Sequence, residues 1–172
     1  YRPPAVSPTA ATQLTQAHRA LRLGRPEAVW ATLHQLWSHQ ASPGLYTWDA
    51  PRPTQDEVAD GWQYARGWHN ETAVSPDYET AALLLLLQQD MLAYLDEAAA
   101  EPTVVLGAGI TPAWLPQPMA VSNLALPGGS ITWQWDGQKM RVTLRGPMRK
   151  IQLGSAFPPG TELAVVQKPL RP

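Results

Sequence analysis

Cysteine is absent from this chain of 172 residues. Its absence excludes a disulfide framework, thiolate metal sites and cysteine nucleophiles, although it leaves the cellular compartment open. A surplus of one charge is also missing, because the formal net charge is only −1. Such a chain has no electrostatic footprint for nucleic acid or for an anionic membrane, so we expect neither as a partner.

Long hydrophobic runs are lacking too. The run Leu83–Leu87 ends at Gln88, far short of the roughly 18–20 apolar residues that span a membrane. No basic segment followed by an apolar one opens the chain, so no signal peptide is indicated. The first residue is Tyr1 rather than methionine, and we therefore expect a processed product or a fragment of a longer protein.

Proline and tryptophan, by contrast, are abundant, with 18 prolines and eight tryptophans against a single phenylalanine. The prolines predict fixed loops and sharp helix starts. Most of the tryptophans are simply explained as core residues. They also suit carbohydrate binding, because a flat indole stacks on the C–H face of a pyranose while its N–H donates a hydrogen bond.

Helical periodicity covers much of the first hundred residues. A helix is predicted from a cap within residues 7–9 to Gly24, and a second begins at Pro26 with an apolar stripe that includes Trp30 and Trp37. Their short connection predicts an antiparallel helical hairpin.

The third predicted helix organises the chain. It is expected to run from an N-cap at Ser75 to about Ala100. Five consecutive leucines, Leu83–Leu87, point in every direction around a helix of about 3.6 residues per turn, which predicts a central, buried helix. A helical hairpin covers only one side of it, so we expect further cover from a missing partner or from an oligomer.

From residue 103 the apolar period changes to two, which is typical of strands. Strands are predicted over residues 103–106, 119–124, 149–153 and 162–167, with a hairpin over 130–144. Asp136-Gly137 resembles a two-residue type I′ turn that would pair Trp135 with Gln138 and Trp133 with Met140.

The predicted fold class is therefore α+β. N-terminal helices, a helical hairpin plus one long buried helix, are followed by a small antiparallel β-sandwich. We place a helical segment with a long aromatic loop in residues 1–101 and an antiparallel β-domain in residues 102–172.

The connection over residues 40–74 is long for a compact domain, and a loop of that length is functional or contains structure that the pattern conceals. It is dense in aromatic residues and carboxylates. Two interpretations stay open: a ligand-binding loop, or an irregular loop whose aromatic side chains pack between helices. The candidates for substrate binding in this loop and at the start of the third helix are Trp48, Trp62, Trp68, His69 and Tyr78.

Carboxylates beside aromatic residues are the candidates for catalysis. Asp49 follows Trp48, and Glu71 lies close after Trp68 and His69. Glycoside hydrolysis needs two carboxyl groups that flank the scissile bond, one kept protonated by an apolar setting and the other ionised. We take Asp49 and Glu71 as the catalytic candidates.

Other chemistries have little support. The chain has neither an HExxH zinc motif nor a GxSxG elbow, and His34 and His39 lie five residues apart, which misses one helical face. Gly107-Ala108-Gly109 is not followed by a helical pattern, so no dinucleotide site is expected there. We expect neither a metal nor a cofactor. The remaining carboxylates near the loop are explained as a solvated face or as helix caps: Asp56, Glu57 and Asp60, and Asp77 and Glu79.

Four segments follow one another in an informative order: GLYTWDA, WHNETAVSPDYETAALLLLLQQDMLAYLD, LGAGITPAWL and SNLALPGGSITWQWDGQKMRVTL. This order resembles the C-terminal end of large bacterial glycoside hydrolases, with the α-L-rhamnosidase-like enzymes as the nearest comparison. Those enzymes carry a helical toroid, an (α/α)6 barrel, followed by a small β-sandwich.

The resemblance implies roles for two residues. Asp49 takes the place of an acidic residue that serves as general base and is usually glutamate, and Tyr78 takes the place of an aromatic residue or histidine at the start of the last toroid helix. A toroid has far more helices than this chain offers. The resemblance thus implies a C-terminal piece or a degenerate relative, with the general acid elsewhere.

We therefore expect the C-terminal portion of a glycoside hydrolase-like protein that acts on or binds carbohydrate, with hydrolysis by paired carboxylates. The alternative is a non-catalytic structural or sugar-binding α+β module that docks on a missing partner or oligomerises. The expected partners are carbohydrate and either the upstream part of the same polypeptide or a second copy of the chain.

Overall fold

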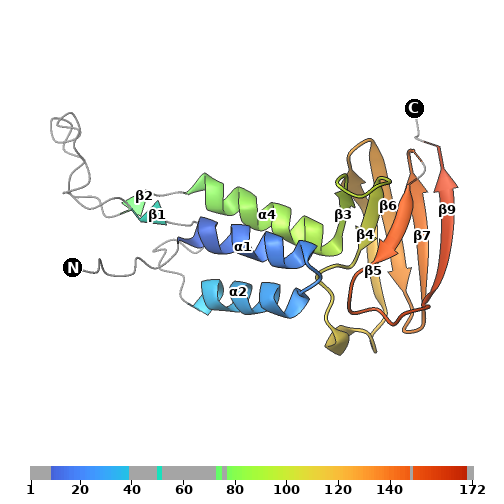
Figure 1. Cartoon of the computed structure of the whole chain (residues 1–172), viewed down its shortest axis with the longest axis horizontal. Helices are drawn as coiled ribbons and strands as arrows, with labels where there is room; N and C mark the ends of the chain where they lie inside the picture. The colour runs from blue at the N-terminus through green and yellow to red at the C-terminus, as the bar shows by residue number, and fades with distance from the viewer. Residues whose placement is uncertain (1–8, 39–49, 52–72, 75–76, 148, 170–172) are drawn as a thin grey trace.

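The computed structural model describes residues 9–38, 50–51, 73–74, 77–147 and 149–169. Among these residues, three α-helices lie side by side at one end of the molecule and two larger sheets lie at the other (Figure 1). The helices are α1 (Ala10–Arg22), α2 (Pro26–Ser38) and α4 (Tyr78–Leu92). The α+β fold class, with helices first and strands after them, is confirmed.

The described strands form a short ladder and two sheets. The ladder joins β1 (Ala50–Pro51) to β2 (Ala73–Val74). One sheet has the order β3-β4-β8 and the other has the order β5-β6-β7-β9. Their bounds are β3 Ala93–Asp96, β4 Thr103–Leu106, β5 Met119–Leu126, β6 Gly129–Trp135, β7 Lys139–Arg145, β8 Lys150–Leu153 and β9 Glu162–Lys168, and a 3₁₀ turn, η2, spans Pro112–Trp114.

The predicted helical hairpin of α1 and α2 is present. Thr9 is the N-cap of α1, because its hydroxyl accepts the N–H of Thr12 at 3.2 Å. The chain reverses at Gly24, whose φ of 68° suits a residue without a Cβ. Apolar side chains of both helices then meet in one buried cluster, which includes Leu14, Ala17 and Leu21 of α1 and Val29, Leu33 and Leu36 of α2.

Helix α4 is shorter than predicted, and one side of it is exposed. Asp77, rather than Ser75, caps it by accepting the N–H of Glu79 at 3.1 Å and that of Thr80 at 3.3 Å. The helix ends at Leu92, because the chain continues as strand β3, which the helical pattern concealed. Leu87 is fully buried, whereas the exposed fractions of Leu85 and Leu86 are 67% and 54%. The described residues therefore leave one side of the leucine run uncovered, as expected for a helical hairpin that packs against only one side of it.

Leu86 and Leu87 form a matched pair for measuring this asymmetry. Replacing Leu87 by alanine is expected to lower the free energy of unfolding by about 2–5 kcal/mol, because it leaves a cavity against α1. Replacing Leu86 by alanine should change it by less than about 0.5 kcal/mol, because that side chain is mostly in solvent. Urea unfolding of both variants measures the difference, and equal losses would contradict the described packing of α4.

Polar contacts also join α1 to the end of α4. Arg22 Nη2 donates to Asp90 Oδ2 at 2.8 Å, and His18 Nδ1 lies 3.7 Å from the same oxygen. His18 Nε2 lies 3.1 Å from the Leu83 carbonyl oxygen. Both ring nitrogens thus face acceptors, which favours the doubly protonated ring. The Asp90 carboxylate raises the pKa of His18 above its usual 6.5, and burial works in the opposite direction.

This raised pKa predicts a pH-dependent contribution to stability. The contribution of His18 is fully present below the unfolded pKa of 6.5 and is lost as the pH rises through the higher folded pKa. Thermal unfolding of the unsubstituted protein and of His18→Gln at about pH 5 and about pH 9 checks this. The substitution should be more destabilising at the lower pH, and an equal effect at both would show that the imidazolium contributes nothing.

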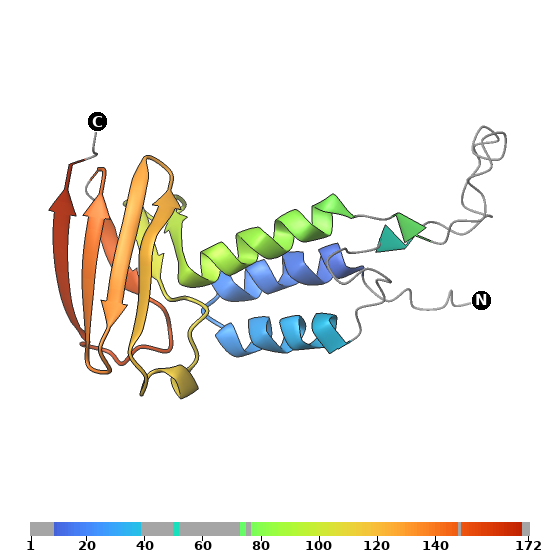
Figure 2. The same cartoon turned by 180° about the vertical axis from the view of Figure 1, so that it is seen from behind.

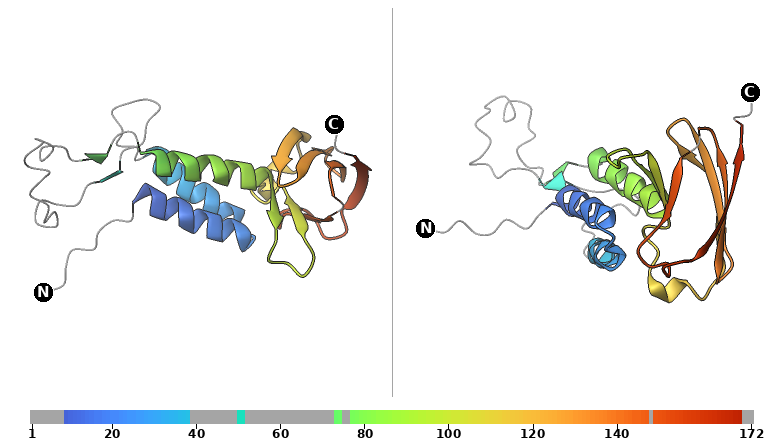
Figure 3. Two further views of the ribbon diagram at one scale, coloured as in Figure 1. Left: turned by 90° about the horizontal axis from the view of Figure 1, so that it is seen from above. Right: turned by 45° about the vertical axis from the view of Figure 1, so that its right-hand side comes forward.

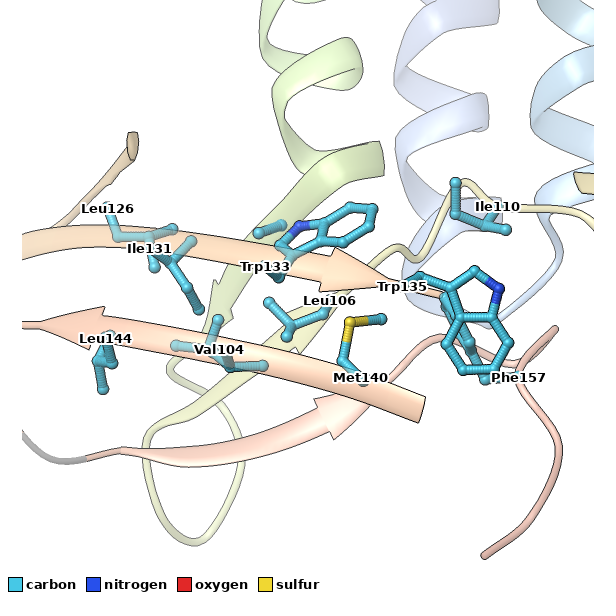
Figure 4. Packing of buried hydrophobic residues seen from close by; sticks show 12 residues of the cluster. Val104, Leu106, Ile110, Leu126, Ile131, Trp133, Trp135, Met140, Leu144 and Phe157 are labelled. Carbon is cyan, nitrogen blue, oxygen red and sulfur yellow. The ribbon is translucent and has the colours of Figure 1, made fainter. Parts of the chain in front are cut away.

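The two larger sheets pack face to face around an apolar core, as Figure 4 shows. Val104 and Leu106 point into this core from β4, and Trp133 and Met140 point into it from β6 and β7. Val105, on the opposite face of β4, belongs to the second core with the helices. The three-stranded sheet therefore lies between the helices and the four-stranded sheet. It also includes β3, which precedes the predicted domain boundary at residue 101.

The strand pairs are mostly antiparallel, and two are parallel: β4 with β8 and β7 with β9. In the predicted hairpin, Trp135 pairs with Met140 and Trp133 with Val142, so the predicted register is wrong by two residues. The cause is a longer turn. Asp136 Oδ1 accepts the N–H groups of Gln138 and Lys139 at 3.1 and 3.0 Å, which makes residues 136–139 the connection. A shift of two keeps every side chain on its predicted face.

Candidate functional site

The ladder of β1 and β2 lies beyond the start of α4, at the end of the helices that is remote from both larger sheets (Figures 1 and 2). Its pairs are Ala50 with Val74 and Pro51 with Ala73. In the sequence Asp49 directly precedes β1, and Glu71 precedes β2 by two residues. The ladder thus ties together the two ends of the segment that contains most of the predicted site.

Most of the predicted site residues lie outside the described part of the chain: Trp48, Asp49, Trp62, Trp68, His69 and Glu71. In the antiparallel register of the ladder, the chain leaves toward residue 49 from one end and toward residue 71 from the other. A catalytic pair made of these two carboxylates therefore needs more than the ladder to form.

Tyr78 is the one predicted site residue that the structure describes. It is the first residue of α4, and 78% of it is exposed, so its ring is available for a ligand. Its neighbour Asp77 is engaged as the helix cap, since Oδ1 accepts two backbone N–H groups and Oδ2 accepts the hydroxyl of Thr80. The capping explanation of Asp77 is confirmed.

A cluster of aromatic rings that we had not predicted lies along one flank of α2, beside its buried residues. Trp30, His34 and Trp37 follow one another at helical spacing, and Trp114 of η2 joins them. The ring centroid of Trp30 lies 5.3 Å from that of Trp114 and 6.4 Å from that of Trp37. His34 lies 5.8 Å from Trp37, edge to face. We name these four residues the aromatic row.

The glycine-rich segment after β4 positions one end of this row. Gly109 is pressed against α4, because an added Cβ would lie 2.4 Å from the Cβ of Met91, and its N–H donates to the Met91 carbonyl oxygen at 2.9 Å. Its own carbonyl oxygen accepts the indole N–H of Trp30 at 2.8 Å. Gly107-Ala108-Gly109 is therefore a packing element that fixes the path of the chain toward Trp114.

Two hollows lined by described residues lie beside the sheets. One of about 280 Å³ follows β8 and the turn after Phe157, and one of about 260 Å³ lies between Gly24 and the end of β8. Neither lining includes a carboxylate, so neither has the acid and base that glycoside hydrolysis requires. In the described part of the chain, no group of three or more His, Asp or Glu side chains is placed to hold a metal ion, and no helix is long and apolar enough to cross a membrane.

A scan against protein-family models, a search of curated proteins and a search of solved structures each returned no match for this chain. Its function is therefore argued from its residues and their arrangement.

Proposed function

We propose that this chain is the C-terminal portion of a glycoside hydrolase-like protein that acts on carbohydrate. The observation that carries the proposal is the uncovered side of α4, where Leu85 and Leu86 face solvent. A helix with leucines on its outer side is typical of a helix that packs within a larger helical body. Tyr78 and the ladder of β1 and β2 lie at the start of this same helix.

The segment between β1 and β2, with the residues that flank it, supplies the proposed chemistry. Asp49 acts as the general base, as the resemblance to the α-L-rhamnosidase-like enzymes implies, and removes a proton from the attacking water. A carboxylic acid protonates the glycosidic oxygen as the bond to the leaving group breaks. Glu71 is the candidate for that acid within this chain, and the remainder of a larger protein is the alternative source. Trp48, Trp62, Trp68, His69 and Tyr78 supply the surfaces against which sugar rings stack.

A panel of aryl glycosides and plant and microbial oligosaccharides tests this proposal in the full-length natural protein. We expect release of free sugar from at least one member of the panel, with one water consumed for each bond broken. If no member of the panel is cleaved, the protein is not a glycoside hydrolase of the proposed kind.

A second candidate is a non-catalytic sugar-binding or structural module. The observation that favours it is the aromatic row, which offers two partly exposed indoles at a place distinct from the proposed catalytic residues. Saturable binding of an oligosaccharide without any cleavage would identify this second function.

A further inference from the structure

We infer that the aromatic row of Trp30, His34, Trp37 and Trp114 is a binding surface for a neutral oligosaccharide. It uses none of the residues assigned to catalysis, and it lies on α2, which α1 separates from α4 (Figure 1 and the right-hand view of Figure 3). The inference therefore goes beyond hydrolysis and stands or fails separately from it.

The first argument is that α2 carries aromatic residues beyond those that its buried core stripe needs. Its core side is complete, since Val29, Leu33 and Leu36 are buried in the cluster to which α1 and α4 also contribute. Trp30, His34 and Trp37 form a second stripe that flanks the buried one. Trp30 is partly buried against the core, and the exposed fractions of Trp37 and Trp114 are both 43%. Scattered exposed apolar side chains need no explanation, but contiguous ones mark a site of contact.

The second argument is the hydrogen-bonding state of the indoles. The indole N–H of Trp30 donates to the Gly109 carbonyl oxygen, and this hydrogen bond holds the middle ring of the row in place. Among the described residues, neither Trp37 nor Trp114 has a hydrogen-bond acceptor for its N–H. A partly exposed indole suits a sugar, because the face stacks on ring C–H groups and the N–H donates to a hydroxyl.

The geometry of the row fits several sugar rings rather than one. Trp37 and Trp114 each contact Trp30 but not each other, and their planes are tilted from that of Trp30 by 58° and 45°. The ring planes of the row therefore change direction from one residue to the next, as the planes of successive rings of an oligosaccharide do. A single pyranose would cover only one of the two exposed indoles.

The charges of the row indicate a neutral ligand. The segment PEAVWATLHQLWS, which forms α2 and carries three of the four residues of the row, contains no Lys or Arg. An anionic membrane would require basic residues beside the tryptophans, and an acidic sugar would require a cation.

Calorimetric titration of the full-length natural protein with neutral oligosaccharides of glucose, mannose, xylose and rhamnose tests the inference. We expect at least one to bind, Trp37→Ala and Trp114→Ala each to weaken binding roughly 2- to 10-fold, and the double variant to weaken it roughly 5- to 100-fold. Leu23→Ala is the matched control, because Leu23 is exposed and apolar but lies outside the row, and it should leave the affinity unchanged. The circular dichroism of each variant should match that of the unsubstituted protein.

A second measurement does not depend on any variant. In the unsubstituted protein, the indole N–H resonances of Trp37 and Trp114 should shift on addition of the sugar that binds. Unchanged affinity in the double variant, unshifted indole resonances, no binding by any of the sugars, or a dimer that the double variant dissolves would each overturn the inference. Cleavage of a small aryl glycoside separates the two proposals: it should persist in the double variant, and its absence alongside intact binding would count against the hydrolase only.

Discussion

Replacing Asp49 by asparagine in the full-length natural protein is expected to lower the rate of glycoside cleavage by about 10²–10⁴-fold. The amide has the same size as the carboxylate but cannot accept a proton from water. The loss should fall on kcat, because the missing proton transfer belongs to the transition state rather than to substrate binding. Steady-state kinetics on the best substrate of the glycoside panel measure it.

Asp56→Asn is the matched control for Asp49→Asn. It makes the same chemical change in the same part of the sequence, at a carboxylate that we attribute to a solvated face. Its rate should equal that of the unsubstituted protein. Full activity of Asp49→Asn would clear Asp49 of the role of base.

Replacing Trp133 by alanine is expected to lower the free energy of unfolding by about 3–5 kcal/mol. Only 1% of Trp133 is exposed, and it lies in the core between the two larger sheets (Figure 4). Its indole N–H also donates to the Leu92 carbonyl oxygen at 3.2 Å, at the point where α4 becomes β3. The substitution removes a large buried ring and one of the two donors to the Leu92 carbonyl oxygen, which still accepts the N–H of Gly107 at 2.9 Å.

Two further variants separate these contributions. Trp133→Phe keeps an aromatic ring in the core and loses the hydrogen bond, so it should be less destabilising than the alanine variant. Trp114→Ala removes the same side chain from a half-exposed position and should change the free energy of unfolding by no more than about 1 kcal/mol. Urea unfolding measures all three, and similar losses for Trp133→Ala and Trp114→Ala would contradict the described core.

The sequence pattern predicted which strand side chains are buried better than it predicted which strands pair and in which register. Alternation placed Ile131, Trp133 and Trp135 on one side of β6, and all three are buried. The register depended instead on a side chain, because Asp136 extends the turn by bonding two backbone N–H groups. Local pattern also contains no information on direction, so the parallel pairing of β9 with β7 was not foreseen.

The end of α4 shows another limit of local pattern. The apolar residues of β3 continue those of the helix, and only pairing with β4, from Ala93–Leu106 to Asp96–Thr103, marks the change to a strand. The reason is physical: extended backbone is favoured at that point by hydrogen bonds to residues later in the chain.

The aromatic row could not be predicted from the sequence for a similar reason. Trp30 and Trp37 fit the apolar stripe of a core helix, and Trp114 fits a loop that packs inward. Their meeting depends on the path of the chain after β4, which the contact between Gly109 and Met91 and the bond from Trp30 to Gly109 determine. The spacing of Trp30, His34 and Trp37 along α2 was the available signal, since it sets one side of the helix apart from the buried leucines.

The most direct test of the claim that this protein binds carbohydrate is a tryptophan fluorescence titration with plant and microbial glycans. Tryptophans occur both in the segment proposed for catalysis and in the aromatic row, so a sugar bound at either place changes the emission. We predict a saturable change with at least one glycan of the panel. An emission spectrum that no glycan alters would contradict both the hydrolase and the sugar-binding module.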